Sequence, residues 1–341
     1  MTDDQAVALS LARTLSRVGL TERLKNDDPT LLELADTHLT ELPAMRRLST
    51  SAGIEVLPWT AASFPPLLLA TPDCPPALWY RGNLAVLGAP CVAIVGSRVA
   101  TAGALEIAST IAADLATLGV VVISGLARGV DSAAHRGALQ QGTTIAVLGS
   151  GLDRIYPAEH ARLADQIATA GLVLSEYPPG TPPLPFHFPQ RNRLISGLSR
   201  AVVVIEAAEN SGSLITAACA LEQGREVMAV PGNVLSGRNR GGHALIRDGA
   251  KIVERADDIV GELGLGAGSP TSGPADQARG QVPRDPVALA MEEGEPYDLD
   301  ALTAALGMSG PVVLARLLQL EILGIVRRAG GGRFIRPGRT C

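Results

Sequence analysis

Two patterns of apolar residues occur along the chain: short pieces of helical periodicity near its ends, and continuous apolar runs alternating with helical segments in its middle. From Pro90 to about Gly261, continuous apolar runs rich in β-branched residues alternate with segments of helical periodicity. The runs are CVAIVGS, GVVVISG, TTIAVLGS, GLVLSE, RAVVVIEA and REVMAVPG. Continuous runs are typical of parallel strands that helices cover on both faces. The pattern therefore predicts a doubly wound α/β domain with a mostly parallel sheet.

The segments on either side predict smaller units. Short apolar-periodic pieces separated by Gly and Pro predict a helical module over residues 1–60, of the SAM-like or helix-hairpin-helix-like type. The Pro-rich stretch FPPLLLATPDCPPALWYRGN predicts a connecting arm, which we include in the α/β domain at 61–262. Residues 263–284 predict a flexible linker. Three helical patterns and two strands around a Gly turn predict a winged helix over 285–341.

Composition narrows the class of protein. With 341 residues, 46% hydrophobic and 18% charged, the chain is typical of a globular protein of two or three domains. No apolar run reaches the roughly 18 residues of a membrane span, so we expect a cytosolic protein without a membrane partner. The Cys and His spacings match no metal site, and we expect neither a metal nor a cofactor.

The charge of the chain does not by itself decide whether it binds nucleic acid. The formal net charge of −5 argues against a surface coated for nucleic acid, but binding depends on where the charge lies. Lys25 and Lys251 are the only lysines, so almost all positive charge is arginine. Guanidinium groups suit phosphates and stack on bases. A genome that favours Arg codons would produce the same bias.

Polar residues gather where the predicted strands end. In doubly wound sheets, ligands bind at the carboxyl ends of strands, where loops and helix N-termini present backbone amides. The first such loop, Gly96-Ser97-Arg98, lacks the dinucleotide fingerprint. Arg98 there is either a phosphate partner or a helix-capping or ion-paired surface residue. Similar loops follow the later strands and contain LARGVD, LDRIYP, AENSGSLITAA and NVLSGRNRGG.

Two of these loops allow a specific local interpretation. Asp131 is placed to cap the helix that follows it, and this role is favoured over acid–base chemistry with His135 because no nucleophile is nearby. The segment SGSLITAA is predicted to begin a helix whose hydroxyls and amides hold an anion, although serines there are also ordinary caps.

The segment FHFPQRNRLISG is unusual in a chain with only 3% aromatic residues. The prolines before it favour an extended chain. An extended chain carrying Phe186, Phe188, Arg191 and Arg193 fits single-stranded nucleic acid, whose bases stack on rings while guanidinium binds the backbone. The alternative is that the rings pack into the core and the arginines pair with Glu176 or Glu206.

Together these motifs resemble the DprA/Smf DNA-processing family. The motifs occur in family order: GSR at 96–98, SGLARGVDSAAH at 124–135, GSGLDRIYP at 149–157, SEYPPG at 175–180, FPQRNRLISGLS at 188–199, SGSLITA at 211–217 and AVPGN at 229–233. The resemblance is strong over about residues 55–260. It extends more weakly to the ends, where family members often carry a helical module and a winged helix.

The resemblance implies a non-catalytic protein with a Rossmann-like core. Such a protein binds single-stranded DNA in a basic pocket, protects incoming DNA, self-associates and helps load the recombinase RecA during natural transformation. Residues 241–253 resemble the self-association region, with His243, Leu245 and Ile246 in it. The residues implied for the DNA pocket are Gly96, Ser97, Arg98, Ser124, Gly125, Arg128, Gly129, Gly149, Gly151, Tyr156, Phe188, Arg191, Asn192, Arg193, Ser211, Gly212, Ser213 and Thr216.

Two other functions remain open at this point. A nucleotide-processing enzyme of the phosphoribohydrolase type is typically marked by PGGxGTxxE, where this chain reads SGSLITAA. A transcription regulator would read duplex DNA with the winged helix. The helix GPVVLARLLQLEIL has Arg316 as its only cation, so we expect a weak DNA or protein contact there. The hairpin arginines Arg327, Arg328, Arg333 and Arg336 are placed to touch phosphate.

Overall fold

We analysed a computed structural model of the chain. It describes residues 1–12, 15–265, 285–292, 295–322, 325–329 and 333–336. The contacts divide the chain into two compact units, Met1–Gly268 and Ser269–Cys341, which are described separately below. The predicted linker, 263–284, lies outside the described residues from 266 onward.

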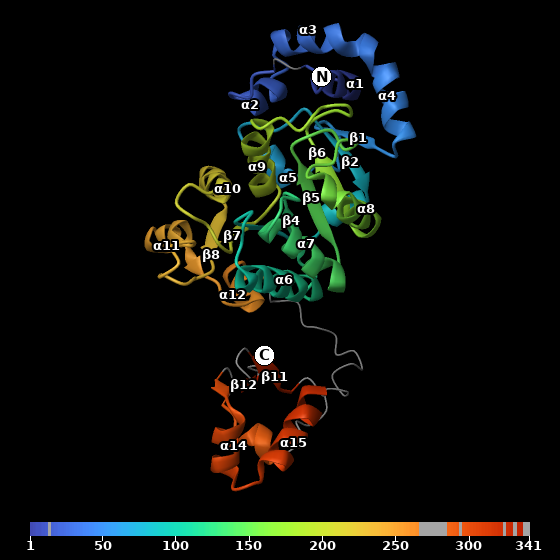
Figure 1. Ribbon diagram of the computed structural model, residues 1–341. Helices are drawn as coiled ribbons and strands as arrows, with labels where there is room; N and C mark the ends of the chain where they lie inside the picture. Colours follow the sequence, from blue (N-terminus) through green and yellow to red (C-terminus); the bar gives the residue numbers. More distant parts are fainter. Residues whose placement is uncertain (13–14, 266–284, 293–294, 323–324, 330–332, 337–341) are drawn as a thin grey trace. The chain divides into compact units, whose positions relative to one another are not determined.

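The first unit is built on a nine-stranded sheet in the order β1-β2-β6-β5-β4-β3-β7-β8-β9 (Figure 1). The strands from β6 to β9 in this order are parallel. The six apolar runs form strands as predicted, which confirms the doubly wound α/β class. They are β3 (Cys91–Val95), β4 (Val121–Ser124), β5 (Thr144–Leu148), β6 (Leu172–Ser175), β7 (Ala201–Val204) and β8 (Glu226–Ala229), and β9 (Lys251–Ile252) follows them.

The sheet has an antiparallel edge that the sequence interpretation missed. Strand β1 (Glu55–Pro58) pairs with β2 (Ala77–Gly82), and β2 pairs antiparallel with β6. Residues 55–58 therefore belong to the sheet, although they were predicted to lie in a helical module. The Pro-rich segment is also more than a connecting arm, because it supplies β2, in which Trp79 is fully buried.

Helices cover both faces of the sheet, which explains the continuous apolar runs. Along β3, Val92 and Ile94 pack on one face while Ala93 and Val95 pack on the other. The first face is covered by α6 (Ala102–Thr117), α7 (Val130–Gln141), α8 (Ala161–Ala170) and α12 (Ala256–Glu262). The second is covered by α5 (Pro66–Leu69), α9 (His187–Gly197), α10 (Gly212–Glu222) and α11 (Arg240–Arg247).

The strand order reverses next to β3, and this reversal positions the candidate site. Strands β4, β5 and β6 lie on one side of β3, whereas β7, β8 and β9 lie on the other. The loops that leave the carboxyl ends of β3 and β7 therefore run to helices on opposite faces of the sheet. Such a reversal opens a crevice at the strand ends, where ligands bind in open α/β sheets.

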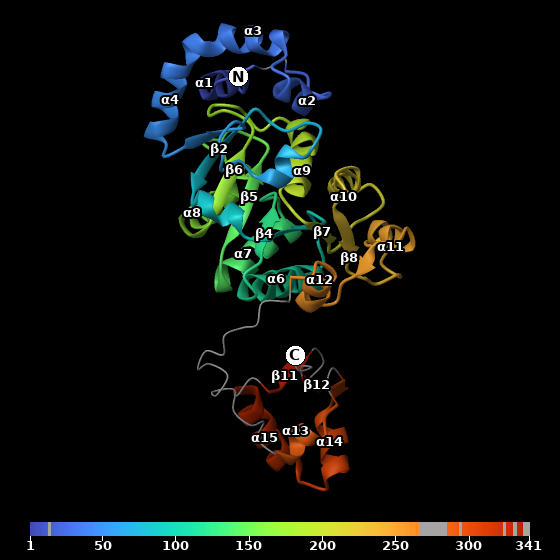
Figure 2. The same ribbon diagram turned by 180° about the vertical axis from the view of Figure 1, so that it is seen from behind.

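The N-terminal helices pack onto this sheet as part of the same unit. They are α1 (Asp3–Leu9), α2 (Leu20–Lys25), α3 (Pro29–His38) and α4 (Leu42–Ser51), and Figures 1 and 2 show them at one end of the sheet. Val7 and Ala8 share one apolar cluster with Trp79 and Leu148. The predicted helices are present, and their apolar contacts extend into the core of the α/β domain.

The second unit has a winged-helix fold, as predicted. Its elements are α13 (Pro286–Leu289), β10 (Pro296–Tyr297), α14 (Leu299–Leu306), α15 (Gly310–Ile322), β11 (Arg327–Ala329) and β12 (Arg333–Ile335). The strands form a small sheet in the order β10-β12-β11. Val313, Leu317 and Phe334 are buried at its centre.

Among the described residues, no single helix is long and apolar enough to cross a bilayer. Helices α14 and α15 meet the length and composition criteria only as a pair bent by 111°.

Candidate functional site

A half-open pocket of about 450 Å³ lies in the crevice between β3 and β7. The loop after β3 forms one wall, the pocket face of α9 forms the second, and the start of α10 forms the third. We call this the crevice pocket. The predicted residues that it brings together are Gly96, Ser97, Arg98, Phe188, Arg191, Asn192, Ser211, Gly212, Ser213 and Thr216.

Residues 187–197 form helix α9, so the predicted extended chain is wrong for this part of the segment. Pro189 is the third residue of the helix. Proline is tolerated there because the amides of the first helical turn have no partner within the helix. Residues on one face of a helix recur every three or four positions, and this spacing brings Phe188, Asn192 and Ile195 to the pocket.

Two aromatic rings at the pocket rim form a tilted pair, with an interplanar angle of 45°. The centroids of Tyr156 and Phe188 lie 5.3 Å apart, and the Arg98 guanidinium lies 5.7 Å from the Phe188 centroid. Phe188 is partly exposed and Phe186 is 57% exposed, so neither ring packs into the core as the alternative interpretation expected. A cation beside an aromatic face suits a base and its phosphate at the same time.

Arg191 lies beneath the pocket and is almost fully buried, with 3% of its surface exposed. Its guanidinium donates a hydrogen bond to the Val147 carbonyl. It passes so close to Gly125 that a Cβ there would lie 2.1 Å from Nη1, which explains the glycine. Burial lowers the pKa of Arg191 to about 10, although the Asp131 carboxylate opposes this shift.

Asp131 stabilises a loop and does not cap its helix. Its carboxylate accepts hydrogen bonds from the Gly125 and Ala127 amides at 3.1 and 3.4 Å. Burial raises the pKa of Asp131, and the nearby Arg191 opposes this shift. The N-cap of α7 is Gly129 at φ +75°, where a Cβ would lie 2.2 Å from the Ser97 carbonyl oxygen. The capping prediction for Asp131 is therefore wrong.

His135 is completely buried, and its Nδ1 lies 2.8 Å from Thr144 Oγ1. Burial lowers the pKa of His135 to about 3, so the ring is neutral near pH 7. A neutral ring without solvent access does not serve as the acid–base partner of Asp131.

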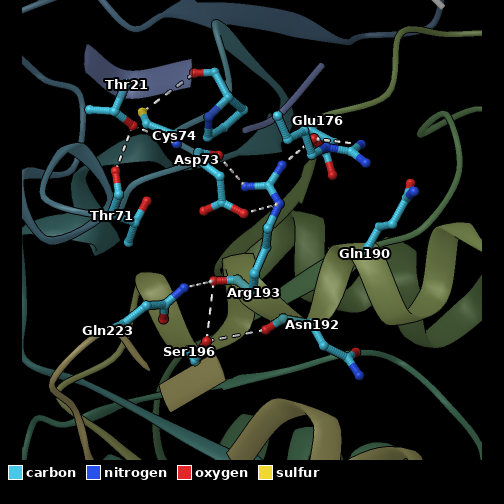
Figure 3. A network of polar contacts seen from close by, with 12 residues as sticks. Thr21, Thr71, Asp73, Cys74, Glu176, Gln190, Asn192, Arg193, Ser196 and Gln223 are labelled. Carbon is cyan, nitrogen blue, oxygen red and sulfur yellow. Dashed lines mark hydrogen bonds and ion pairs between the residues drawn. The ribbon is translucent and has the colours of Figure 1, made fainter. Parts of the chain in front are cut away.

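Arg193 points away from the crevice pocket and makes ion pairs. Its guanidinium lies 2.5 Å from Glu176 and 3.2 Å from Asp73, and Glu176 also pairs with Arg17 at 3.1 Å. Figure 3 shows Arg193 between Asp73 and Glu176, whereas the Asn192 side chain lies away from both carboxylates. The alternative prediction, that these arginines pair with Glu176, is therefore correct for Arg193. Arg193 does not line the crevice pocket.

The remaining predicted residues lie around the pocket without lining it. Ser124 is buried and donates to the Ile94 carbonyl at 2.7 Å, while Arg128 is exposed and pairs with Glu159 at 2.8 Å. Gly149 lets Phe188 approach closely, because a Cβ there would lie 3.1 Å from the ring. A Cβ on Gly151 would lie 2.7 Å from the Pro178 carbonyl oxygen. These residues support the walls and the rim.

The pocket also contains residues that the sequence interpretation passed over. Asp131 was interpreted as a cap, in preference to an acid–base role, and Asn210 stands in the quoted loop AENSGSLITAA without a role. The additional apolar residues are Val95, Val99, Ala127, Pro189, Ile195, Ala208 and Ile215. The position of Asn210 just before a predicted helix was the one available signal.

Helix α11 carries the residues of the resembled self-association region. His243 Nε2 lies 3.0 Å from the Gly232 carbonyl oxygen. Leu245 and Ile246 are partly buried against the sheet core. Neighbouring strand β9 is the last in the sheet, and its Ile252 is 53% exposed.

Two of the arginines of the winged-helix unit have carboxylate partners. Arg316 pairs with Asp285 at 3.5 Å, and Arg328 pairs with Glu321 at 3.2 Å. In the part of the chain that the structure describes, no cluster of His, Cys, Asp or Glu is arranged to hold a metal ion.

We expect Arg193→Ala to destabilise the protein by about 3–5 kcal/mol, because it removes the shared cation from two carboxylates. Glu176 is the more buried of them, with 8% of its side chain exposed. Arg98→Ala is the control and should change the unfolding free energy by no more than about 0.5 kcal/mol. Urea denaturation measures both values. An unchanged midpoint for Arg193→Ala would contradict the structural role.

Comparisons with known proteins agree with this architecture. The family model for DNA recombination-mediator protein A matches residues 55–264, and the DprA winged helix domain matches residues 270–332. Protein Smf of Escherichia coli K12 is 41% identical over 293 residues, which cover 84% of this chain and 78% of that protein. DNA processing protein DprA of Streptococcus pneumoniae R6 is 50% identical over 192 residues, covering 56% and 68%.

Solved structures of DprA proteins are also similar to this chain. The X-ray structure of DprA from Streptococcus pneumoniae superposes with a TM-score of 0.62 at 39% identity, covering 76% of this chain and 93% of that chain. DNA processing protein A from Helicobacter pylori, described for its single-stranded DNA binding mode, gives 0.57 at 30% identity, covering 62% and 96%. The chain therefore belongs to the DprA/Smf family of DNA recombination-mediator proteins.

Proposed function

We propose that this chain is a non-catalytic protein that binds single-stranded DNA in the crevice pocket. The observation that carries the proposal is the convergence of Arg98, Phe188 and Asn192 with the start of α10 at the strand-order reversal. The Helicobacter pylori relative, described for its single-stranded DNA binding mode, supports the same ligand.

The pocket provides what a single strand requires. Bases of any sequence stack on aromatic rings, and Phe188 with Tyr156 forms such a surface. Phosphates require cations, and Arg98 and Arg191 line the pocket with Asp131 as the one carboxylate. Local positive charge therefore allows DNA binding by a chain whose formal net charge is −5.

We expect Arg98→Ala to weaken oligo-dT binding by about tenfold, because one charged contact to phosphate is lost. The slope of log affinity against log salt concentration should fall by about 0.7, as expected for one phosphate contact on a single strand. Fluorescence anisotropy at several salt concentrations measures both. Arg162→Ala on α8 removes the same charge from an exposed position outside the pocket and is the matched control. Equal affinities and slopes for wild type and Arg98→Ala would refute the pocket assignment.

We expect Phe188→Ala to reduce oligo-dT affinity by about 1–3 kcal/mol, because the stacking surface for one base is removed. The loss should depend little on salt, in contrast to that of Arg98→Ala. Phe186→Ala is the control, since Phe186 precedes Phe188 by two residues but does not line the pocket. The same titration compares the two variants. If Phe188→Ala and Phe186→Ala both bind oligo-dT like the wild type, Phe188 is not a stacking residue and serves only to pack against the loop at Gly149.

Two further parts of the proposal come from the family resemblance. We propose that α11 mediates self-association through His243, Leu245 and Ile246. The neighbouring edge strand β9, with Ile252 half exposed, supports an association surface here, because sheet edges pair readily with other chains. We also propose that the DNA-bound protein protects incoming strands and helps to load the recombinase RecA.

We expect Ile246→Glu to shift the wild-type dimer to monomer in sedimentation velocity, because a carboxylate would be placed in the contact between copies. The circular dichroism spectrum checks that the variant is folded, since Ile246 also contacts the core. Stimulation of RecA ATPase on strands coated with single-strand binding protein tests loading with both proteins. A wild-type chain that sediments as a monomer at all concentrations would disprove self-association, and a wild type without effect on RecA would disprove loading.

A further inference from the structure

A groove of about 620 Å³ lies on the surface of the first unit between α7 and α8, two of the helices labelled in Figure 1. One face of α7 lines it with Arg136, Leu139 and Gln140, and one face of α8 lines it with Arg162 and Gln166. Residues three or four positions apart share one face of a helix, so each set faces the groove together. We call this the α7–α8 groove. Among the described residues, it shares no lining residue with the crevice pocket.

Arg136 and Arg162 are exposed cations, and the structure records no ion pair for either of them among the described residues. By contrast, most described arginines of the first unit have an ion pair or a hydrogen bond. The carboxylates close to them already have partners, because Asp165 lies 3.2 Å from Arg81 and Glu159 belongs to another ion pair. The groove therefore carries an excess of positive charge in a chain whose formal net charge is −5.

The α7–α8 groove also presents an apolar side chain and two carboxamides. Leu139 is partly buried and packs against the apolar cluster beneath the two helices. Gln140 and Gln166 are exposed, and no hydrogen bond is recorded for either side chain in the described part of the chain. A carboxamide both donates and accepts hydrogen bonds, as a peptide group does. These two side chains are therefore placed to pair with the backbone of an extended peptide.

The composition of the α7–α8 groove favours a peptide over a nucleic acid. None of the described residues that line it is aromatic, whereas the bases of a single strand require a stacking surface such as Phe188 in the crevice pocket. Two unpaired cations are also few for a nucleic acid, whose affinity depends on neutralising several phosphates. A short segment with separated carboxylates and one apolar side chain matches both the charge of the groove and the exposed part of Leu139.

We propose that the α7–α8 groove binds an acidic peptide segment of a partner protein. Carboxylates of the segment pair with Arg136 and Arg162, and an apolar side chain packs on Leu139. The peptide backbone pairs with Gln140 and Gln166. Because the groove and the crevice pocket are lined by different residues, the chain can hold this partner and a DNA strand at the same time. Exposed ion pairs contribute little each, so we expect a dissociation constant of about 0.1–1 mM for a short peptide.

The probe is a fluorescein-labelled peptide of sequence Glu-Glu-Leu-Glu-Glu, and Gln-Gln-Leu-Gln-Gln is its uncharged counterpart. In fluorescence anisotropy we expect the full-length wild type to bind the acidic peptide more tightly than the uncharged one, and added salt to weaken this binding. Combining Arg136→Gln with Arg162→Gln should weaken acidic-peptide binding by about tenfold, since two ion pairs are lost at about threefold each. Arg47→Gln on α4 is the matched control, because Arg47 is exposed and also has no recorded ion pair among the described residues.

Oligo-dT distinguishes the α7–α8 groove from the crevice pocket. Saturating oligo-dT should leave acidic-peptide binding unchanged, and so should Arg98→Ala, because Arg98 lines the crevice pocket. The double variant should bind oligo-dT like the wild type. Its circular dichroism spectrum should also match that of the wild type, because both replaced arginines are exposed.

Several results would overturn the inference. Equal binding of the acidic and uncharged peptides, or equal acidic-peptide binding by the wild type and the double variant, would mean that the two arginines hold no carboxylate. Displacement of the acidic peptide by oligo-dT would place the peptide in the crevice pocket instead. Weaker oligo-dT binding by the double variant would make the groove a nucleic-acid contact. A wild type that binds the acidic peptide through these arginines but binds no oligo-dT would refute the proposed function and leave this inference intact.

Discussion

The reversal of strand order at β3 is the constraint on which the rest of the site depends. Because β4 and β7 flank β3 on opposite sides, the chain must leave β3 and β7 toward opposite faces of the sheet. This leaves a crevice that neither connection fills. The start of α10 opens onto it from one side, and the loop of Gly96 to Arg98 borders it on the other. An acidic chain thereby places two of its arginines, Arg98 and Arg191, in one small volume, where their charge is felt at short range.

Helix α9 is held by two buried arginines that have different tasks. Arg191 lies under the crevice pocket near the Asp131 carboxylate and without a direct ion pair among the described residues, whereas Arg193 is paired with Asp73 and Glu176. The first arginine lines the pocket, and the second fixes the helix that carries Phe188 and Asn192. A buried cation with its own carboxylates adds little to ligand binding, but removing it leaves those carboxylates uncompensated.

The sequence predicts the parallel strands and most of the pocket, because both depend on local patterns. A strand covered on both faces reads as a continuous apolar run, and Gly with polar residues marks its carboxyl end. Strand β2 was missed because prolines directly precede ALWYRG, and α9 was missed because prolines precede it and one lies in its first turn. Arg191 and Arg193 are indistinguishable in an extended chain, where alternate residues share a side. In a helix they point about 200° apart, so only the three-dimensional structure separates their roles.

Glu176 links the N-terminal region to the wall of the crevice pocket, and this link bears on the affinity of the pocket for a ligand. Its carboxylate pairs with Arg193 of α9 and also with Arg17, which lies in the segment between α1 and α2. Neither Arg17 nor the described residues of α1 and α2 line the crevice pocket. The N-terminal region thus limits the conformational entropy of the wall that carries the stacking ring. A preorganised wall loses less entropy when a ligand binds. Changes near Arg17 are therefore transmitted to affinity as an entropic term, without altering a single ligand contact.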